Sequence, residues 1–191
     1  MRLLRNYKYI TELAGKSVVV LGVGGIGSEV AKRLQAFDMS VYGFARKTKE
    51  KPCFDIIVHS KEELKELLKQ SDYVISTLPD NIDTIAFVNR ELLGCMKDHV
   101  TIVNVGRRKV FNEDDLFSFL KGHKQATAFL DMFERFPNPI TNRFRQLKNV
   151  CVLPGVTAIS QEIDTRLYKL VENNLNRMAN NELPINILNH A

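Results

Sequence analysis

The chain has 191 residues, which is enough for one domain of ordinary or slightly large size with a full hydrophobic core. Hydrophobic residues make up 45% and charged residues 26%, as in soluble globular proteins, and no apolar run reaches the length of a membrane span. The net charge is +5, but basic and acidic residues are interleaved, as in residues 61–66, and no arginine stripe is present, so nucleic acid is not an expected partner.

The N-terminus and the cysteines indicate a cytoplasmic protein. The first eight residues lack the long apolar core and the small-residue cleavage site of a signal peptide. Cys53, Cys95 and Cys151 are far apart and form no C-x-x-C pair, which favours reduced thiols over disulfides or a zinc site. The four histidines are also isolated, so no metal site is expected.

Predicted strands and helices alternate along the chain. In order, we expect a helical lead-in over residues 1–14, a strand at 17–21, a helix at 25–37, strands at 40–44 and 55–58, a helix at 61–70, a strand at 72–77, a helix at 89–96, a strand at 100–105, a helix at 112–120, strands at 126–130 and 150–153, and a helix at 160–180. The strands are apolar without a period-two alternation, which is typical of a parallel sheet buried between helices. The sequence therefore predicts an α/β fold, a Rossmann-type doubly wound, mainly parallel sheet with helices on both faces. One domain is expected over residues 15–180, with a C-terminal tail over 181–191.

Two of the predicted helices carry further signals. Ser60 and Glu63 match a capping box that opens the helix at 61–70. The final helix has an apolar stripe that is expected to form core or subunit contacts rather than a chemical site: Ile163, Leu167, Leu170, Val171, Leu175 and Met178.

A glycine-rich turn joins the first strand to the first helix. Gly22, Gly24 and Gly27 fit the pattern G-x-G-x-x-G. The first glycine allows the tight turn, the second lets a pyrophosphate approach the backbone, and the third lets the helix lie close to the strand. The amides and the positive dipole end at the helix start favour a phosphate. The turn therefore predicts a dinucleotide site, and the alternative is a purely structural turn.

Five short motifs follow one another in the sequence. They lie at residues 13–27, at 34–39, at 71–72 with 77–79, 84 and 89, at 102–107, and at 130–134. Together they resemble the nucleotide-binding domain of the D-isomer-specific 2-hydroxyacid dehydrogenases, from about Leu13 to the end of the chain. In that family a separate substrate domain is built mostly from upstream residues, and here only about a dozen residues precede the match. The chain is thus similar to one half of such an enzyme, as a shortened relative or a fragment.

The resemblance implies where ligands bind. Arg107 matches the arginine that binds the substrate carboxylate and polarises its carbonyl, a task that suits a bidentate guanidinium; the alternative is that it only caps a strand end through a nearby carboxylate. Asp131 matches the aspartate that lies by the nicotinamide. With the residues of the glycine turn and of the loop after the second strand, the expected cofactor-binding set is Gly22, Gly24, Gly25, Ile26, Gly27, Ala45, Arg46, Lys47, Thr48, Leu78, Pro79, Thr84, Val105, Gly106, Arg107 and Asp131.

Two positions depart from the family pattern. The catalytic glutamate stands five residues after the aspartate, and that position is Phe136; Glu134 is nearer but does not match it. The general acid/base histidine follows the proline of the last strand, and here Pro154 is followed by Gly155. Positioned acid/base catalysis contributes roughly 10²–10⁴-fold, and neither phenylalanine nor glycine donates a proton. Efficient reduction of a 2-oxo acid is therefore not expected.

The end of the second strand indicates which cofactor binds. NAD-preferring Rossmann domains usually place an acidic residue there for the ribose 2′-hydroxyl, and that position is Ala45. Arg46, Lys47, Thr48 and Lys49 follow it, and cations at this place favour a 2′-phosphate. We expect NADP in preference to NAD. A solvated basic loop is the alternative and leaves the preference open.

Three functional hypotheses remain. The first is a dinucleotide-binding protein of dehydrogenase descent with little or no turnover, acting in regulation, sensing or assembly. The second is an active NAD(P)-dependent oxidoreductase on a 2-hydroxy or 2-oxo acid, completed by a separate substrate-domain subunit or using another proton donor, such as Glu134 or a water. The third is an interaction scaffold without a ligand. The resemblance also implies a homodimer, because these domains form the dimer core in the family.

Overall fold

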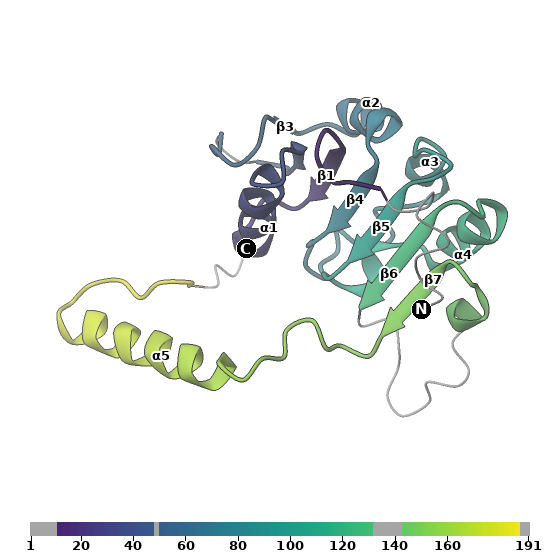
Figure 1. Ribbon diagram of the computed structural model, residues 1–191. Helices are drawn as coiled ribbons and strands as arrows, with labels where there is room; N and C mark the ends of the chain where they lie inside the picture. Colours follow the sequence, from purple (N-terminus) through teal and green to yellow (C-terminus); the bar gives the residue numbers. More distant parts are fainter. Residues whose placement is uncertain (1–10, 48–49, 132–142, 188–191) are drawn as a thin grey trace. The chain divides into compact units, whose positions relative to one another are not determined.

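Seven parallel strands form one sheet in the part of the chain that the structure describes, which is residues 11–47, 50–131 and 143–187 of a computed structural model (Figure 1). The spatial order is β3-β2-β1-β4-β5-β6-β7. The strands up to β3 are added on one side of β1 and those from β4 onward on its other side, so the order of addition reverses between β1 and β4. This order confirms the doubly wound α/β fold, in which ligands bind beyond the carboxyl ends of the strands at the reversal point. The strands are β1 (Ser17–Leu21), β2 (Ser40–Phe44), β3 (Ile56–Val58), β4 (Tyr73–Ser76), β5 (Thr101–Asn104), β6 (Thr127–Asp131) and β7 (Val150–Leu153).

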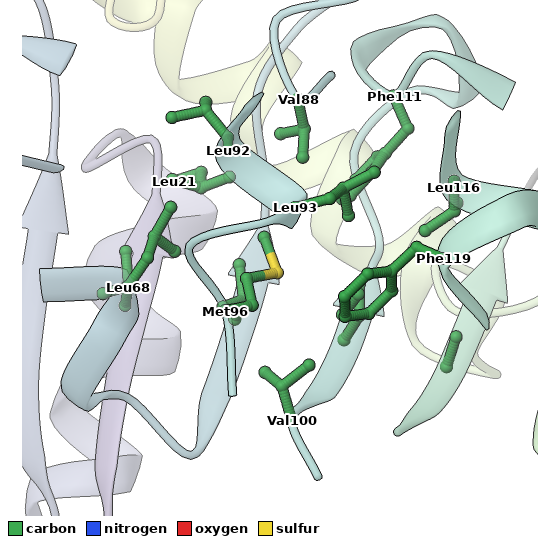
Figure 2. Packing of buried hydrophobic residues seen from close by; sticks show 14 of the residues in the cluster. Leu21, Leu68, Val88, Leu92, Leu93, Met96, Val100, Phe111, Leu116 and Phe119 are labelled. Atoms are coloured by element: carbon green, nitrogen blue, oxygen red, sulfur yellow. The ribbon is translucent and has the colours of Figure 1, made fainter. Parts of the chain in front are cut away.

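Helices cover the sheet from both sides. Val19 and Leu21 of β1 belong to a buried cluster with residues of α2 (Lys61–Gln70), α3 (Arg90–Leu93) and α4 (Glu113–Gly122), part of which Figure 2 shows. Val18 and Val20 point to the other face and join a second cluster that includes Ala31 of α1 (Gly25–Gln35). Both faces of β1 are therefore buried, which is why its sequence is an unbroken apolar run.

Local hydrogen bonds determine where α2 begins and where α3 ends. Ser60 and Glu63 form the predicted capping box, in which the Ser60 hydroxyl accepts from the Glu63 amide at 3.2 Å and the Glu63 carboxylate accepts from the Ser60 amide at 3.1 Å. The Ser60 hydroxyl also donates to the Glu63 carboxylate at 2.7 Å, and this bond, together with the bond from the Ser60 amide, holds the pKa of Glu63 below its usual value, because both stabilise the ionised carboxylate. The helix expected at 89–96 is only Arg90–Leu93, because its last turn tightens into i→i+3 bonds beyond that point, such as the Met96 amide to the Leu93 carbonyl.

The chain divides into two compact units, Met1–Val156 and Thr157–Ala191. The second contains α5 (Ile163–Ala179), and its tail is bound within the unit, because Asn174 accepts a hydrogen bond from the Ile185 amide at 2.8 Å. Of the expected lead-in helix at 1–14, residues 1–10 lie outside the described residues, and residues 11–14 lead into a turn instead of a helix. The roles of the lead-in, the 15–180 domain and the 181–191 tail stay predictions.

A partly buried carboxylate, Asp72, joins two segments of the chain at the amino edge of the sheet. Asp72 accepts hydrogen bonds from the Ser17 amide at 3.0 Å and from Lys97 Nζ at 2.7 Å. Burial raises the pKa of Asp72, but the bonds from Lys97 and Ser17 outweigh it, so the net pKa lies below the usual value. A hollow of about 630 Å³ opens beside this carboxylate, and none of the expected cofactor-binding residues lines it.

Replacing Asp72 with asparagine is expected to lower the free energy of unfolding at neutral pH. The folded-state pKa of Asp72 is depressed, so its contribution is present above the unfolded pKa of about 3.9 and is lost as pH falls through the folded pKa. The difference between wild type and variant should shrink in acid, which denaturant unfolding at neutral and low pH measures. Asp98→Asn, at a highly exposed carboxylate, is the control. A difference that stays constant with pH would contradict this origin.

Candidate functional site

The glycine turn after β1 is tight at two positions and open at a third. Gly22 has a φ of +97°, in the left-handed region, and a Cβ there would lie 2.9 Å from Thr77 Oγ1. A Cβ on Gly27 would lie 1.9 Å from the Gly22 carbonyl oxygen, so α1 starts in direct contact with the turn. A Cβ on Gly24 would meet no atom within 4 Å. The turn therefore has open space at Gly24, whereas Gly27 has no space for a side chain.

The start of α1 has the electrostatics of an anion site. Gly24 is the N-cap residue and offers no side-chain acceptor to the first amides of the helix, and the first turn holds no acidic residue. Gly24, Gly25 and Ile26 are all exposed. Unpaired amides and the positive end of the helix dipole at such a place attract a phosphate group. This is the arrangement expected for the pyrophosphate of a dinucleotide, and its binding at Gly24 stays a prediction.

Two polar residues without a predicted role, Thr77 and Asn104, stabilise the loops at the carboxyl ends of the strands. The Thr77 hydroxyl, directly after β4, donates to the Gly22 carbonyl at 2.9 Å and so fixes the turn. Asn104, at the end of β5, is fully buried; its Oδ1 accepts from the Gly106 amide at 3.1 Å and its Nδ2 donates to the Arg107 carbonyl at 3.2 Å. An asparagine two residues before the Gly106-Arg107 pair, at the end of an apolar strand, could have pointed to this second role.

Arg107 lies where β5 ends, with its side chain exposed. Its backbone is fixed by Asn104, and a Cβ on Gly106 would lie 2.6 Å from the Leu78 carbonyl, so the two loops after β4 and β5 are in close contact. None of the carboxylates in the described part of the chain pairs with Arg107, whose Nη1 donates only to the Gly106 carbonyl at 3.3 Å. Its expected role of binding a substrate carboxylate stays a prediction.

Asp131 ends β6 and is almost completely buried. One of its carboxylate oxygens accepts from the Gly155 amide at 2.7 Å and from the Val156 amide at 3.1 Å. Gly155, which the sequence comparison expects at the position of the family's histidine, has a φ of +77° in the turn after β7, and that correspondence stays a prediction. Asp131 thus fixes this turn, and its expected place beside a nicotinamide stays a prediction.

The basic loop after β2 is joined to its surroundings at three points. The Ala45 carbonyl is 2.6 Å from His59 Nδ1. Arg46 forms an ion pair with Asp83. Lys51, expected only as part of the basic loop, donates to the Val23 carbonyl at 2.6 Å and to Ser28 Oγ at 2.9 Å, so this loop is bonded to the glycine turn.

The loop after β4 is closed by its own polar groups. Thr84 is buried, and its hydroxyl donates to the Pro79 carbonyl at 2.6 Å and accepts from the Asn81 amide at 3.0 Å. Thr84 therefore shapes the loop from within. Leu78 is partly buried and Pro79 is exposed at the same edge of the sheet.

Parallel pairing brings the described candidate residues to one edge. Leu21 pairs with Phe44 of β2 and with Ser76 of β4, and Ser76 pairs with Asn104 of β5, so the loops that follow these strands are neighbours. Thr48, Glu134 and Phe136 lie outside the described residues. Within the described ranges, no group of three or more His, Cys, Asp or Glu could hold a metal, and none of the helices there is long and apolar enough to cross a membrane.

Comparison with known proteins points to one family. A family model described as the NAD binding domain of D-isomer specific 2-hydroxyacid dehydrogenase matches residues 3–156. The glyoxylate reductase of Pyrococcus furiosus is 32% identical over 178 residues, which cover 93% of this chain and 52% of that protein. The D-3-phosphoglycerate dehydrogenase of Methanocaldococcus jannaschii is 31% identical over 178 residues, which cover 93% of this chain and 34% of that protein.

A solved structure agrees with this result. A D-isomer specific 2-hydroxyacid dehydrogenase from Xanthobacter autotrophicus Py2, in complex with NADPH and MES, is similar with a TM-score of 0.81 and 28% identity. The match covers 91% of this chain and 71% of that one. The chain spans 34% and 52% of the lengths of the two curated relatives, so it corresponds to the cofactor part of such proteins.

Proposed function

Since the chain belongs to the D-isomer specific 2-hydroxyacid dehydrogenases, in their NAD-binding domain, we propose that it binds NADP in preference to NAD and has little or no dehydrogenase turnover of its own. The observation that carries the binding proposal is the glycine turn at the reversal point of the sheet. Gly27 is too closely packed for any side chain, whereas Gly24 faces open space beside uncapped amides.

The preference for NADP is supported by charge at the end of β2. Ala45 stands where an acidic residue would hold the ribose 2′-hydroxyl, and Arg46 and Lys47 follow it with exposed side chains. A 2′-phosphate adds a dianion that these cations attract. The related Xanthobacter autotrophicus enzyme was solved with NADPH.

The proposal of weak turnover rests on proton transfer. Reduction of a carbonyl requires a proton donor at the developing alkoxide. Gly155 occupies the position of the family's histidine and carries no side chain, and its amide is already bound to Asp131. Phe136, at the position of the family's glutamate, has no acidic proton either. When bound, the dinucleotide supplies a hydride, and on this proposal the chain's described residues hold and orient it without supplying the proton.

An active oxidoreductase remains the second candidate, and Arg107 favours it. Its guanidinium is exposed on a backbone that Asn104 holds, and it suits the carboxylate of a 2-oxo acid such as glyoxylate, on which the relative from Pyrococcus furiosus is named to act. This function would need a substrate domain from another polypeptide and another proton donor. The homodimer and the cytoplasmic location also stay predictions.

Wild-type protein is expected to bind NADPH in the micromolar range and NADH at least tenfold more weakly in calorimetric titration. Gly24→Val is expected to abolish both, because its side chain fills the space where the pyrophosphate approaches the backbone. Gly122→Val, at another glycine with open space but at the end of α4, is the matched control and should bind like wild type.

Each alternative has its own outcome in this experiment. Tighter binding of NADH than of NADPH would overturn the NADP preference alone. No binding of either dinucleotide by wild type would overturn the proposed function and favour a scaffold without ligand. Oxidation of NADPH in the presence of glyoxylate at rates typical of enzymes would favour the active oxidoreductase.

A further inference from the structure

An ion pair connects two loops across the carboxyl end of β1. Arg46 belongs to the loop after β2, and Asp83 belongs to the loop after β4. In the sheet, β1 lies between these two strands, and the glycine turn continues from its end. The Arg46–Asp83 pair therefore borders the same space as the glycine turn, and its side chains are 65% and 49% exposed.

The position of Asp83 is set by the structure of its loop. Its amide donates to Asn81 Oδ1 at 3.1 Å, and the next residue, Thr84, is buried and bonded to Pro79. Asp83 is thus held on a closed loop and faces the cation that the NADP preference requires. A carboxylate at this place competes with a phosphate for the same guanidinium.

We propose that Asp83 is a specificity-determining residue, whose carboxylate holds Arg46 in the ligand-free protein and weakens binding of a dinucleotide that carries a 2′-phosphate. The inference rests on the proposed NADP binding. NADPH must displace Asp83 from Arg46, and its phosphate is also repelled by the carboxylate. NADH has no 2′-phosphate, so its binding does not depend on this exchange.

The size of the effect follows from the exposure of the pair. Exposed ion pairs contribute little and are screened by salt. Removing the carboxylate should therefore tighten NADPH binding by about threefold to tenfold rather than by orders of magnitude. The gain should decrease as ionic strength rises.

Asp83→Asn is the test, with Asp80→Asn as the matched control, since Asp80 lies in the same loop and pairs with Lys109 instead. Calorimetric titration should show that Asp83→Asn binds NADPH more tightly than wild type and binds NADH with unchanged affinity. Asp80→Asn should change neither. In an Arg46→Ala background, Asp83→Asn should lose most of its effect on NADPH binding, because the guanidinium that Asp83 holds in wild type is absent. Thermal unfolding verifies that all variants are folded.

The outcomes separate this inference from the proposed function. NADPH binding by wild type that Asp83→Asn leaves unchanged, or that Asp80→Asn tightens equally, overturns the role of Asp83 alone. Weaker NADH binding by Asp83→Asn overturns it in another way, because Asp83 would then hold the ribose hydroxyls. No dinucleotide binding by wild type overturns the proposed function together with this inference.

Discussion

Replacing Gly27 with alanine is expected to abolish dinucleotide binding and to lower the free energy of unfolding by about 3 kcal/mol. The added Cβ would lie 1.9 Å from the Gly22 carbonyl oxygen, which is a backbone atom and cannot rotate away. The start of α1 must therefore move off the end of β1, and the amides that would receive the pyrophosphate move with it. Denaturant unfolding and calorimetric titration with NADPH measure the two effects.

Gly25→Ala is the matched control for this change. It places the same methyl group in the same turn, but a Cβ on Gly25 meets no atom within 4 Å. Its stability should stay within about 0.5 kcal/mol of wild type. Equal stability of the two variants would show that α1 does not need its close contact with the turn.

Replacing Asp131 with alanine is expected to cost about 3 kcal/mol of stability. The amides of Gly155 and Val156 lose their acceptor on a buried carboxylate, and hydrogen bonds to charged groups contribute about 1.5–3 kcal/mol each. The turn after β7 should loosen, so hydrogen exchange at these two amides should accelerate more than in the strands of the sheet.

Asp131→Asn separates the hydrogen bond from the loss of the side chain. Its amide oxygen can still accept from one or both backbone amides, so the loss of stability should be smaller than for alanine. Asp98→Ala, at a carboxylate that is 83% exposed, should be close to neutral. Unchanged exchange at Gly155 in Asp131→Ala would contradict the role of Asp131 in this turn.

Local patterns were sufficient to predict most of the fold. The apolar runs predicted β1 and β2 with their observed bounds, Ser17–Leu21 and Ser40–Phe44, because a strand buried between two layers of helices is built mostly from apolar residues. The capping box at Ser60 is local as well. The helix at 89–96 was predicted too long, because the change to i→i+3 bonding after Leu93 has no clear sequence signal.

The connections within the candidate site depend on distant parts of the chain. Glycine spacing identified the turn, but Thr77 reaches the Gly22 carbonyl from 55 residues away, and Asp83 meets Arg46 across 37 residues. Such contacts are created by the order of strands, which a single sequence indicates only as a class of topology. Lys51 could have been noticed as a cation in the loop after β2, but its partner, the Val23 carbonyl, could not.

The bond from Thr77 to the glycine turn also has a kinetic consequence. The pairing of β1 with β2 closes a short stretch of chain, whereas the pairing of β1 with β4 must wait for a loop of more than fifty residues, as the 55-residue separation of Thr77 and Gly22 indicates. A folding intermediate that contains only β1, β2 and α1 would have the glycine motif without its support from Thr77. A dinucleotide would therefore recognise the late, completed state of this chain, and would act mainly by slowing its unfolding.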